Sequence, residues 1–164
     1  MIRRHFAIRR YDKHHLILGD RYEGRASLPE EVLHAARPYV DLLSFQHFSA
    51  PEQIRSDFQC WHELTGKPVL LADAARRRTL PDGARGVDPQ WYRETIRTLR
   101  ETPACVGFHL CGAYLRTRCR CAGLLDEREK PDQEAVEAIA EANRESVRCL
   151  SCSEGTFRES PVRG

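Results

Sequence analysis

Four short apolar segments constrain the fold of this chain more than any other feature of its sequence. They lie at 15–20 (HLILGD), 40–48 (VDLLSFQHF), 68–74 (PVLLADA) and 105–115 (CVGFHLCGAYL). Most are apolar at consecutive positions rather than at every second position, which is typical of strands covered on both faces, as in a parallel sheet. None approaches the roughly 20 apolar residues that a bilayer-spanning helix needs. The segments therefore predict buried parallel strands.

Helical patterns separate these segments. In one expected helix, Asp88 is the N-cap and Pro89 is the first residue. In another, Ser49 is the expected N-cap, and Gly66 is expected to end the helix. The expected helices lie at 27–39, 49–66, 87–102 and 130–147, and the opening segment 2–12 is expected to be the end of a further helix. Each predicted strand is thus followed by a helix.

This order favours an α/β fold in which four parallel strands alternate with helices. Such units join through right-handed crossovers and form either an open doubly wound sheet or a (β/α)8 barrel. Four units are half of a barrel, which takes about 250 residues, whereas this chain has 164. The sequence contains neither GxGxxG nor GxxxxGK[ST], the phosphate-binding loops of nucleotide-binding sheets. We expect one domain at 1–150 and a disordered tail at 151–164.

Composition restricts the partners and the compartment. The chain has 26 basic and 24 acidic residues, a balance that does not indicate nucleic acid or an anionic membrane as a partner. The arginines at 76–78 are expected in a solvated loop. No apolar stretch follows the basic residues of MIRRHFAIRR, so the chain as written indicates the cytoplasm, while a signal peptide on a longer N-terminus would indicate secretion. Localisation stays open between the two.

Polar and aromatic residues gather where the expected strands end, and in parallel α/β proteins ligands bind beyond these carboxyl ends. Carboxylate, amide, imidazole and aromatic groups together suit a sugar, whose hydroxyls take directional hydrogen bonds and whose ring faces pack on aromatics. No cofactor and no metal is expected at this site. The candidate residues are Asp20, Arg21, Gln46, His47, Asp73, His109 and Tyr114.

Several of these candidates also have a purely structural interpretation. Asp73 could be the N-cap of a turn that follows the third strand. Asp20 and Arg21 could form an ion pair with each other in a loop. His47 and His109 could be core histidines with satisfied hydrogen bonds. The sequence alone does not decide between these interpretations and contact with a ligand.

Four cysteines allow a different hypothesis, a zinc-stabilised interaction module. Cys119 and Cys121 form a CxC pair, and Cys149 and Cys152 form a CxxC pair. Structural zinc sites favour pairs separated by two to four residues. The first pair is tighter than this, and a long helical segment separates the two pairs, so free thiols are the favoured interpretation.

Taken together, four stretches resemble beta-agarases and related agarase-like glycoside hydrolases built on the (β/α)8 barrel. The stretches are IRRYDKHHLILGDRYEG, AARPYVDLLSFQHFSAPEQI, WHELTGKPVLLADAA and VGFHLCGAYLRTRCRCAGLLDEREKPDQEAVEAIAEANRE. The resemblance runs from about residue 2 to residue 145. It implies a partial TIM-type barrel, strands five to eight of the family pattern, and a galactan-type oligosaccharide or polysaccharide as partner.

The resemblance also implies roles for the candidate residues. Strand seven of these enzymes ends in the nucleophilic carboxylate, usually glutamate, and Asp73 stands at the matching position with a side chain one methylene shorter. The acid/base glutamate belongs to strand four, which would lie before Met1, so an incomplete hydrolase is expected, with a missing N-terminal half or a second copy as partner. The alternative is a non-catalytic carbohydrate-binding remnant. Location and resemblance together give sugar-binding roles to Gln46, His47, His109 and Tyr114. Asp20 and Arg21 are substrate-binding candidates by their location at the strand end.

Overall fold

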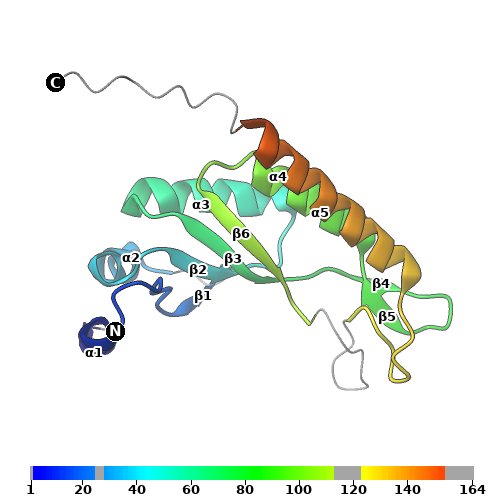
Figure 1. The fold of residues 1–164 in the computed structure, drawn as a ribbon, viewed down its shortest axis with the longest axis horizontal. Helices are drawn as coiled ribbons and strands as arrows, with labels where there is room; N and C mark the ends of the chain where they lie inside the picture. Colours follow the sequence, from blue (N-terminus) through cyan, green and yellow to red (C-terminus); the bar gives the residue numbers. More distant parts are fainter. Residues whose placement is uncertain (1, 25–27, 113–122, 154–164) are drawn as a thin grey trace.

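The computed structural model describes residues 2–24, 28–112 and 123–153 (Figure 1). The first half contains α1 (Ile2–Tyr11), β1 (Arg21–Glu23), α2 (Glu30–Ala36), the 3-10 helix η1 (Arg37–Tyr39), β2 (Leu43–Gln46) and α3 (Pro51–Thr65). The second half contains β3 (Val69–Ala74), β4 (Arg77–Thr79), β5 (Arg85–Val87), α4 (Pro89–Arg100), β6 (Cys105–Leu110) and α5 (Gln133–Ser153).

One parallel sheet organises the fold. Its strand order is β1-β2-β3-β6, and each of the three neighbouring pairs is parallel. Helices α2, α3 and α4 connect successive strands of this sheet, and α5 follows the last strand. Figure 1 shows α3, α4 and α5 on the same side of β3 and β6. This confirms the prediction of four parallel strands alternating with helices, the arrangement of a partial TIM-type barrel.

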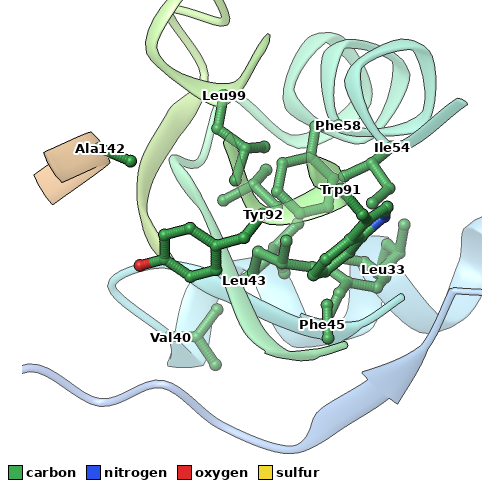
Figure 2. Packing of buried hydrophobic residues seen from close by; sticks show 13 residues of the cluster. Leu33, Val40, Leu43, Phe45, Ile54, Phe58, Trp91, Tyr92, Leu99 and Ala142 are labelled. Carbon is green, nitrogen blue, oxygen red and sulfur yellow. The ribbon is translucent and has the colours of Figure 1, made fainter. Parts of the chain in front are cut away.

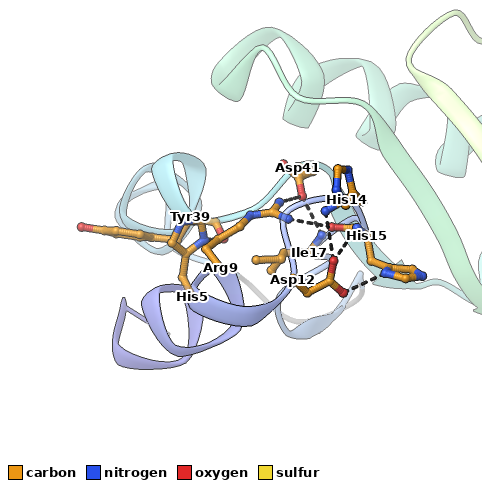
Figure 3. Close-up of polar contacts among 8 residues, drawn as sticks. All are labelled: His5, Arg9, Asp12, His14, His15, Ile17, Tyr39 and Asp41. Atoms are coloured by element: carbon orange, nitrogen blue, oxygen red, sulfur yellow. Dashed lines mark hydrogen bonds and ion pairs between the residues drawn. The ribbon is translucent and has the colours of Figure 1, made fainter.

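The position of the first strand was predicted wrongly. The segment 15–20 forms no strand, and β1 begins at Arg21. Side-chain contacts hold this segment instead: the carboxylate of Asp41 accepts hydrogen bonds from the backbone N–H of Ile17 at 2.6 Å and from the guanidinium of Arg9 at 2.5 Å (Figure 3). These two donors keep the pKa of Asp41 below its ordinary value. The apolar run at 15–20 therefore precedes β1 and is not part of it.

The structure confirms two of the predicted helix-terminal residues and corrects a third. The side chain of Asp88 accepts hydrogen bonds from the backbone N–H groups of Gln90 and Trp91, which confirms it as the N-cap of α4. Gly66 ends α3 in the left-handed conformation, with φ of 65°. Ser49 is not the cap of α3, because that position belongs to Ala50. Helix α5 continues to Ser153, so 151–153 are helical rather than disordered, and 154–164 lie outside the described residues.

The arginines at 76–78 do not form a simple solvated loop. Arg77 and Arg78 belong to β4, which pairs in antiparallel fashion with β5. The guanidinium of Arg78 lies 2.9 Å from the carboxylate of Asp132 and also pairs with Glu134, at the start of α5. The hairpin is thereby attached to a helix more than fifty residues further along the chain.

The hydrophobic core fills the space between the sheet and its helices (Figure 2). Phe45 of β2 and Phe58 of α3 are fully buried, and the ring of Phe45 stacks on Trp61 with centroids 3.6 Å apart. The core residues shown in Figure 2 include Leu33, Val40, Leu43, Ile54, Trp91, Tyr92 and Leu99. Because Leu43 and Phe45 point into this core, the intervening Ser44 and the following Gln46 belong to the other face of the strand.

Candidate functional site

Three polar residues lie in one row across the carboxyl ends of β1, β2 and β3. Glu23 is the register partner of Gln46, and Gln46 is the register partner of Asp73. A register shift after Phe45 places Gln46 opposite Asp73 instead of Ala72, as a bulge does when it redirects a side chain. The amide nitrogen of Gln46 donates a hydrogen bond to the Glu23 carboxylate. We call Glu23, Gln46 and Asp73 the strand-end row.

Arg21 of β1 forms an ion pair with Asp73 of the strand-end row. Its Nη1 lies 3.1 Å from Oδ2 of Asp73, whose side chain is 15% exposed. Since Arg21 belongs to β1 and Asp73 to β3, the guanidinium reaches across β2, and both side chains lie on the same face of the sheet. Asp73 lies inside β3 and pairs with a cation of another strand, so its interpretation as the N-cap of a turn is wrong. The structure likewise pairs Arg21 with Asp73 rather than with Asp20.

Cys111, directly after β6, is a further neighbour of Asp73. Its backbone N–H donates to the carbonyl of Ala74 at 2.9 Å, which brings the thiol to the end of β3. Burial, together with the hydrogen bond to Asp73 and the negative charge of that carboxylate, raises the pKa of the Cys111 thiol to about 11. The thiol is therefore protonated at neutral pH and serves Asp73 as a hydrogen-bond donor.

Replacement of Asp73 by asparagine is expected to lower the pKa of Cys111, because it removes the negative charge that disfavours the thiolate. The thiolate fraction below the pKa rises about tenfold for each unit of the decrease, so alkylation of Cys111 by iodoacetamide at pH 8–9 should be several times faster. Peptide mapping by mass spectrometry measures this rate. The exposed Cys60 is the internal control and should react equally fast in both proteins. An unchanged pH profile for Cys111 would contradict the contact with Asp73.

His47 is buried rather than presented to a ligand. Its side chain is 1% exposed, and Nε2 lies 2.7 Å from the carboxylate of Asp57 on α3. The ring also lies against Gly24, where an added Cβ would come within 2.5 Å of it. The backbone N–H of His47 donates to the carbonyl of Asp73 at 2.9 Å. His47 is therefore a core histidine, but its hydrogen bonds are only half satisfied: Asp57 pairs with Nε2, and the buried Nδ1 has no hydrogen-bond partner among the described residues.

The acid at the carboxyl end of the first strand is Glu23 and not Asp20. Asp20 precedes β1 and therefore lies at its amino end, whereas Glu23 is the last residue of β1. The prediction of Asp20 at the shared rim is wrong for this reason. Glu23 was missed because the apolar run 15–20 was taken as the strand. The pair Glu23–Gly24 was the available signal, since a carboxylate followed by glycine suits a strand end.

Two candidates remain, His109 and Tyr114. His109 lies in β6 and is exposed. Its neighbour Phe108 packs on Trp91 and Tyr92 of α4, so alternation along the strand places His109 on the face away from the helices. Tyr114 lies outside the described residues.

The cysteine side chains of the zinc hypothesis lie outside the part of the chain that the structure describes. Cys119 and Cys121 lie outside the described residues, as do the side chains of Cys149 and Cys152. Among the side chains that the structure describes, no group of three or more His, Cys, Asp or Glu residues is arranged to hold a metal ion. None of the helices in the described ranges combines the length and apolarity needed to cross a membrane.

Comparison with known proteins finds similarity at the level of structure. Neither family models nor curated protein sequences match the chain. A solved exo-beta-agarase is similar with a TM-score of 0.73 and 23% identity over 85% of this chain, which spans 21% of that protein. BpGH50 is similar with a TM-score of 0.66 and 22% identity over 85% of this chain and 33% of its own. A GH2 beta-galacturonidase from Eisenbergiella tayi covers 66% of this chain and 24% of its own, with a TM-score of 0.52 and 17% identity.

The chain thus spans a third or less of the length of these solved proteins. By description, the three are an exo-beta-agarase, a GH50 protein and a GH2 beta-galacturonidase, and each of the first two aligns with 85% of this chain. At these identities the likeness is one of fold. This chain therefore has the fold of part of an agarase-like glycoside hydrolase, with four parallel strands and a polar row at their carboxyl ends.

Proposed function

We propose that the strand-end row is a glycosidase-like site that binds a galactan-type oligosaccharide or polysaccharide, with Asp73 as the catalytic carboxylate. One observation carries the proposal: Asp73 is largely buried at the carboxyl end of β3 and is paired with Arg21 across the sheet. A carboxylate held in this way can act on an anomeric carbon or on a water molecule beside it. The likeness to an exo-beta-agarase supports a galactan as the ligand.

The residues around Asp73 have the chemistry of a sugar site. Gln46 offers an amide that both donates and accepts, and the half-exposed Arg21 offers several N–H donors for hydroxyl groups. His109 lies on the same face at the end of the next strand and can take either role. These groups favour a polar, uncharged ligand with many hydroxyls.

Isothermal titration with agar-derived oligosaccharides tests the proposal. The wild-type chain is expected to bind them, and Arg21→Ala is expected to weaken binding by about tenfold or more, the loss of one charge-assisted hydrogen bond. Glu63→Gln, an exposed position on α3, is the control and should leave binding unchanged. Absence of binding by the wild type would end the proposal. Binding without any cleavage would indicate the non-catalytic carbohydrate-binding alternative.

We further propose that additional strand–helix units cover the two edges of the sheet. Near β1, Leu16 is 66% exposed, and on the other edge strand, β6, Val106 is 56% exposed. Val106 borders a hollow of about 530 Å³ that Leu99 and Phe108 also line. Large exposed apolar side chains beside unpaired strands are typical of surfaces that another polypeptide covers.

The number of helices favours a complementary half-barrel over a second copy as this partner. A barrel has one helix for each of its eight strands, whereas two copies would bring ten, because the described residues already contain five α-helices for four sheet strands. Light scattering after size-exclusion chromatography is expected to give the 18.9 kDa of one chain. A stable dimer would assign the edges to a second copy instead.

A further inference from the structure

The β4–β5 hairpin carries two arginines that lie outside the strand-end row. We propose that Arg77 and Arg85 form a subsite for an anionic substituent on the sugar chain, either a sulfate ester or a uronate carboxylate. This inference deepens the proposed function and rests on it. The row itself favours hydroxyl groups, so the charged substituent is assigned to a sugar unit beside the row. The subsite would also give a role to the arginine run at 76–78, with which the hairpin begins.

Two of the four arginines between residues 76 and 87 have carboxylate partners. The guanidinium of Arg78 lies 2.9 Å from the carboxylate of Asp132, and that of Arg76 lies 3.8 Å from the carboxylate of Asp88. The other two are the arginines of the proposed subsite. Within the part of the chain that the structure describes, neither of them forms an ion pair or a side-chain hydrogen bond. Their N–H donors are therefore available to a ligand.

Strand register places both arginines on the same face of the hairpin. Arg77 is the direct partner of Val87, and Thr79 is the direct partner of Arg85. Alternate residues of a strand share a face, and diagonal neighbours across a strand pair lie about 7–8 Å apart. Arg77 and Arg85 are such diagonal neighbours, and both are exposed, as is Thr79. Arg78 belongs to the opposite face, where it holds the hairpin against the start of α5.

The base of the hairpin lies close to the strand-end row. Arg77 follows Asp73 by four residues, so their Cα atoms are at most about 14 Å apart. Val87, the partner of Arg77, is fully buried, so this end of the hairpin packs against the rest of the fold. Burial is the largest cause of the raised pKa of the Cys111 thiol, and the positive charge of Arg77 acts against it. Arg77 therefore lies near the thiol that donates to Asp73, within reach of a sugar chain bound there.

Guanidinium groups suit an anionic substituent better than a hydroxyl group. Each presents a planar fork of N–H donors that matches two oxygens of one anion, and such charge-assisted hydrogen bonds are about twice as strong as neutral ones. Two guanidinium groups on one face can approach the same anion from two sides. The acid in the turn of the hairpin, Asp82, already accepts a hydrogen bond from the backbone N–H of Ala84 at 2.9 Å. The hairpin thus offers two donors of positive charge on a strand pair that Arg78 attaches to α5.

Isothermal titration with three agar tetrasaccharides tests the inference. They differ only at C6 of one galactose unit, which carries a hydroxyl group, a sulfate ester or, after oxidation, a carboxylate. The wild-type chain is expected to bind at least one charged ligand about tenfold or more tightly than the neutral one, and the larger gain identifies the anion. Arg77→Gln combined with Arg85→Gln should bind all three about equally, with the wild-type affinity for the neutral ligand. Arg93→Gln combined with Arg144→Gln removes the same charge from exposed positions of α4 and α5 and should keep the preference.

Several results would overturn the inference. A wild-type chain that binds all three ligands equally would refute the subsite and leave the proposed function in place. A preference that survives in the Arg77 and Arg85 double variant would locate the anion elsewhere, and an equal loss for all three ligands would make these arginines structural. Loss of the preference in the charge-matched control would mean that net charge attracts the ligand. Absence of binding to every tetrasaccharide would overturn the proposed function, and the inference with it.

Discussion

Replacement of Phe45 by alanine is expected to lower the free energy of unfolding by about 3–5 kcal/mol, the cost of removing a large aromatic side chain from a packed core. Phe45 is fully buried, stacks on Trp61 with ring planes 7° apart and also packs beside Phe58 and Tyr22. Its loss would leave a cavity between β2 and α3. Urea unfolding followed by far-ultraviolet circular dichroism measures the change.

The matched control for this substitution is Phe6→Ala. Phe6 lies on α1 and is 63% exposed, so the same chemical change should alter stability by no more than about 0.5 kcal/mol. Because both variants replace phenylalanine with alanine, the difference between their losses in the free energy of unfolding measures the effect of burial. Similar losses in both would mean that β2 and α3 do not form the centre of the core.

Replacement of Arg78 by alanine is expected to destabilise the fold by about 3 kcal/mol, the lower end of the range for breaking a buried ion pair. The side chain of Asp132 is 6% exposed and would lose the guanidinium that lies 2.9 Å from it. The lower end applies because Arg78 itself is 24% exposed. Thermal or urea unfolding of the variant measures the effect.

Two further variants make this expectation specific. Arg76→Ala removes an exposed arginine whose nearest acid, Asp88, is 3.8 Å away, and should cost less than about 1 kcal/mol. Arg78→Ala combined with Asp132→Asn removes the uncompensated charge and should recover part of the stability. If the double variant is less stable than Arg78→Ala alone, the penalty does not come from an unpaired Asp132.

Local sequence signals determined most of the secondary structure. Short apolar runs identified β2, β3 and β6, because a parallel strand covered on both faces needs consecutive apolar residues. Asp88 and Gly66 marked a helix start and a helix end through hydrogen bonds and backbone conformations that involve only their neighbours in the chain. Asp73 was found at the end of β3 for the same reason: the apolar run stops there.

Only the tertiary structure decided which polar groups meet. A register shift of one residue places Gln46 opposite Asp73 rather than Ala72, and the true start of β1 exchanges Asp20 for Glu23 at the rim. Strand pairing joins residues far apart in the chain, and a shift of one residue moves a side chain to the other face of the sheet. The pattern of apolar residues fixes which segments are strands, but packing between strands fixes their register and hence the site.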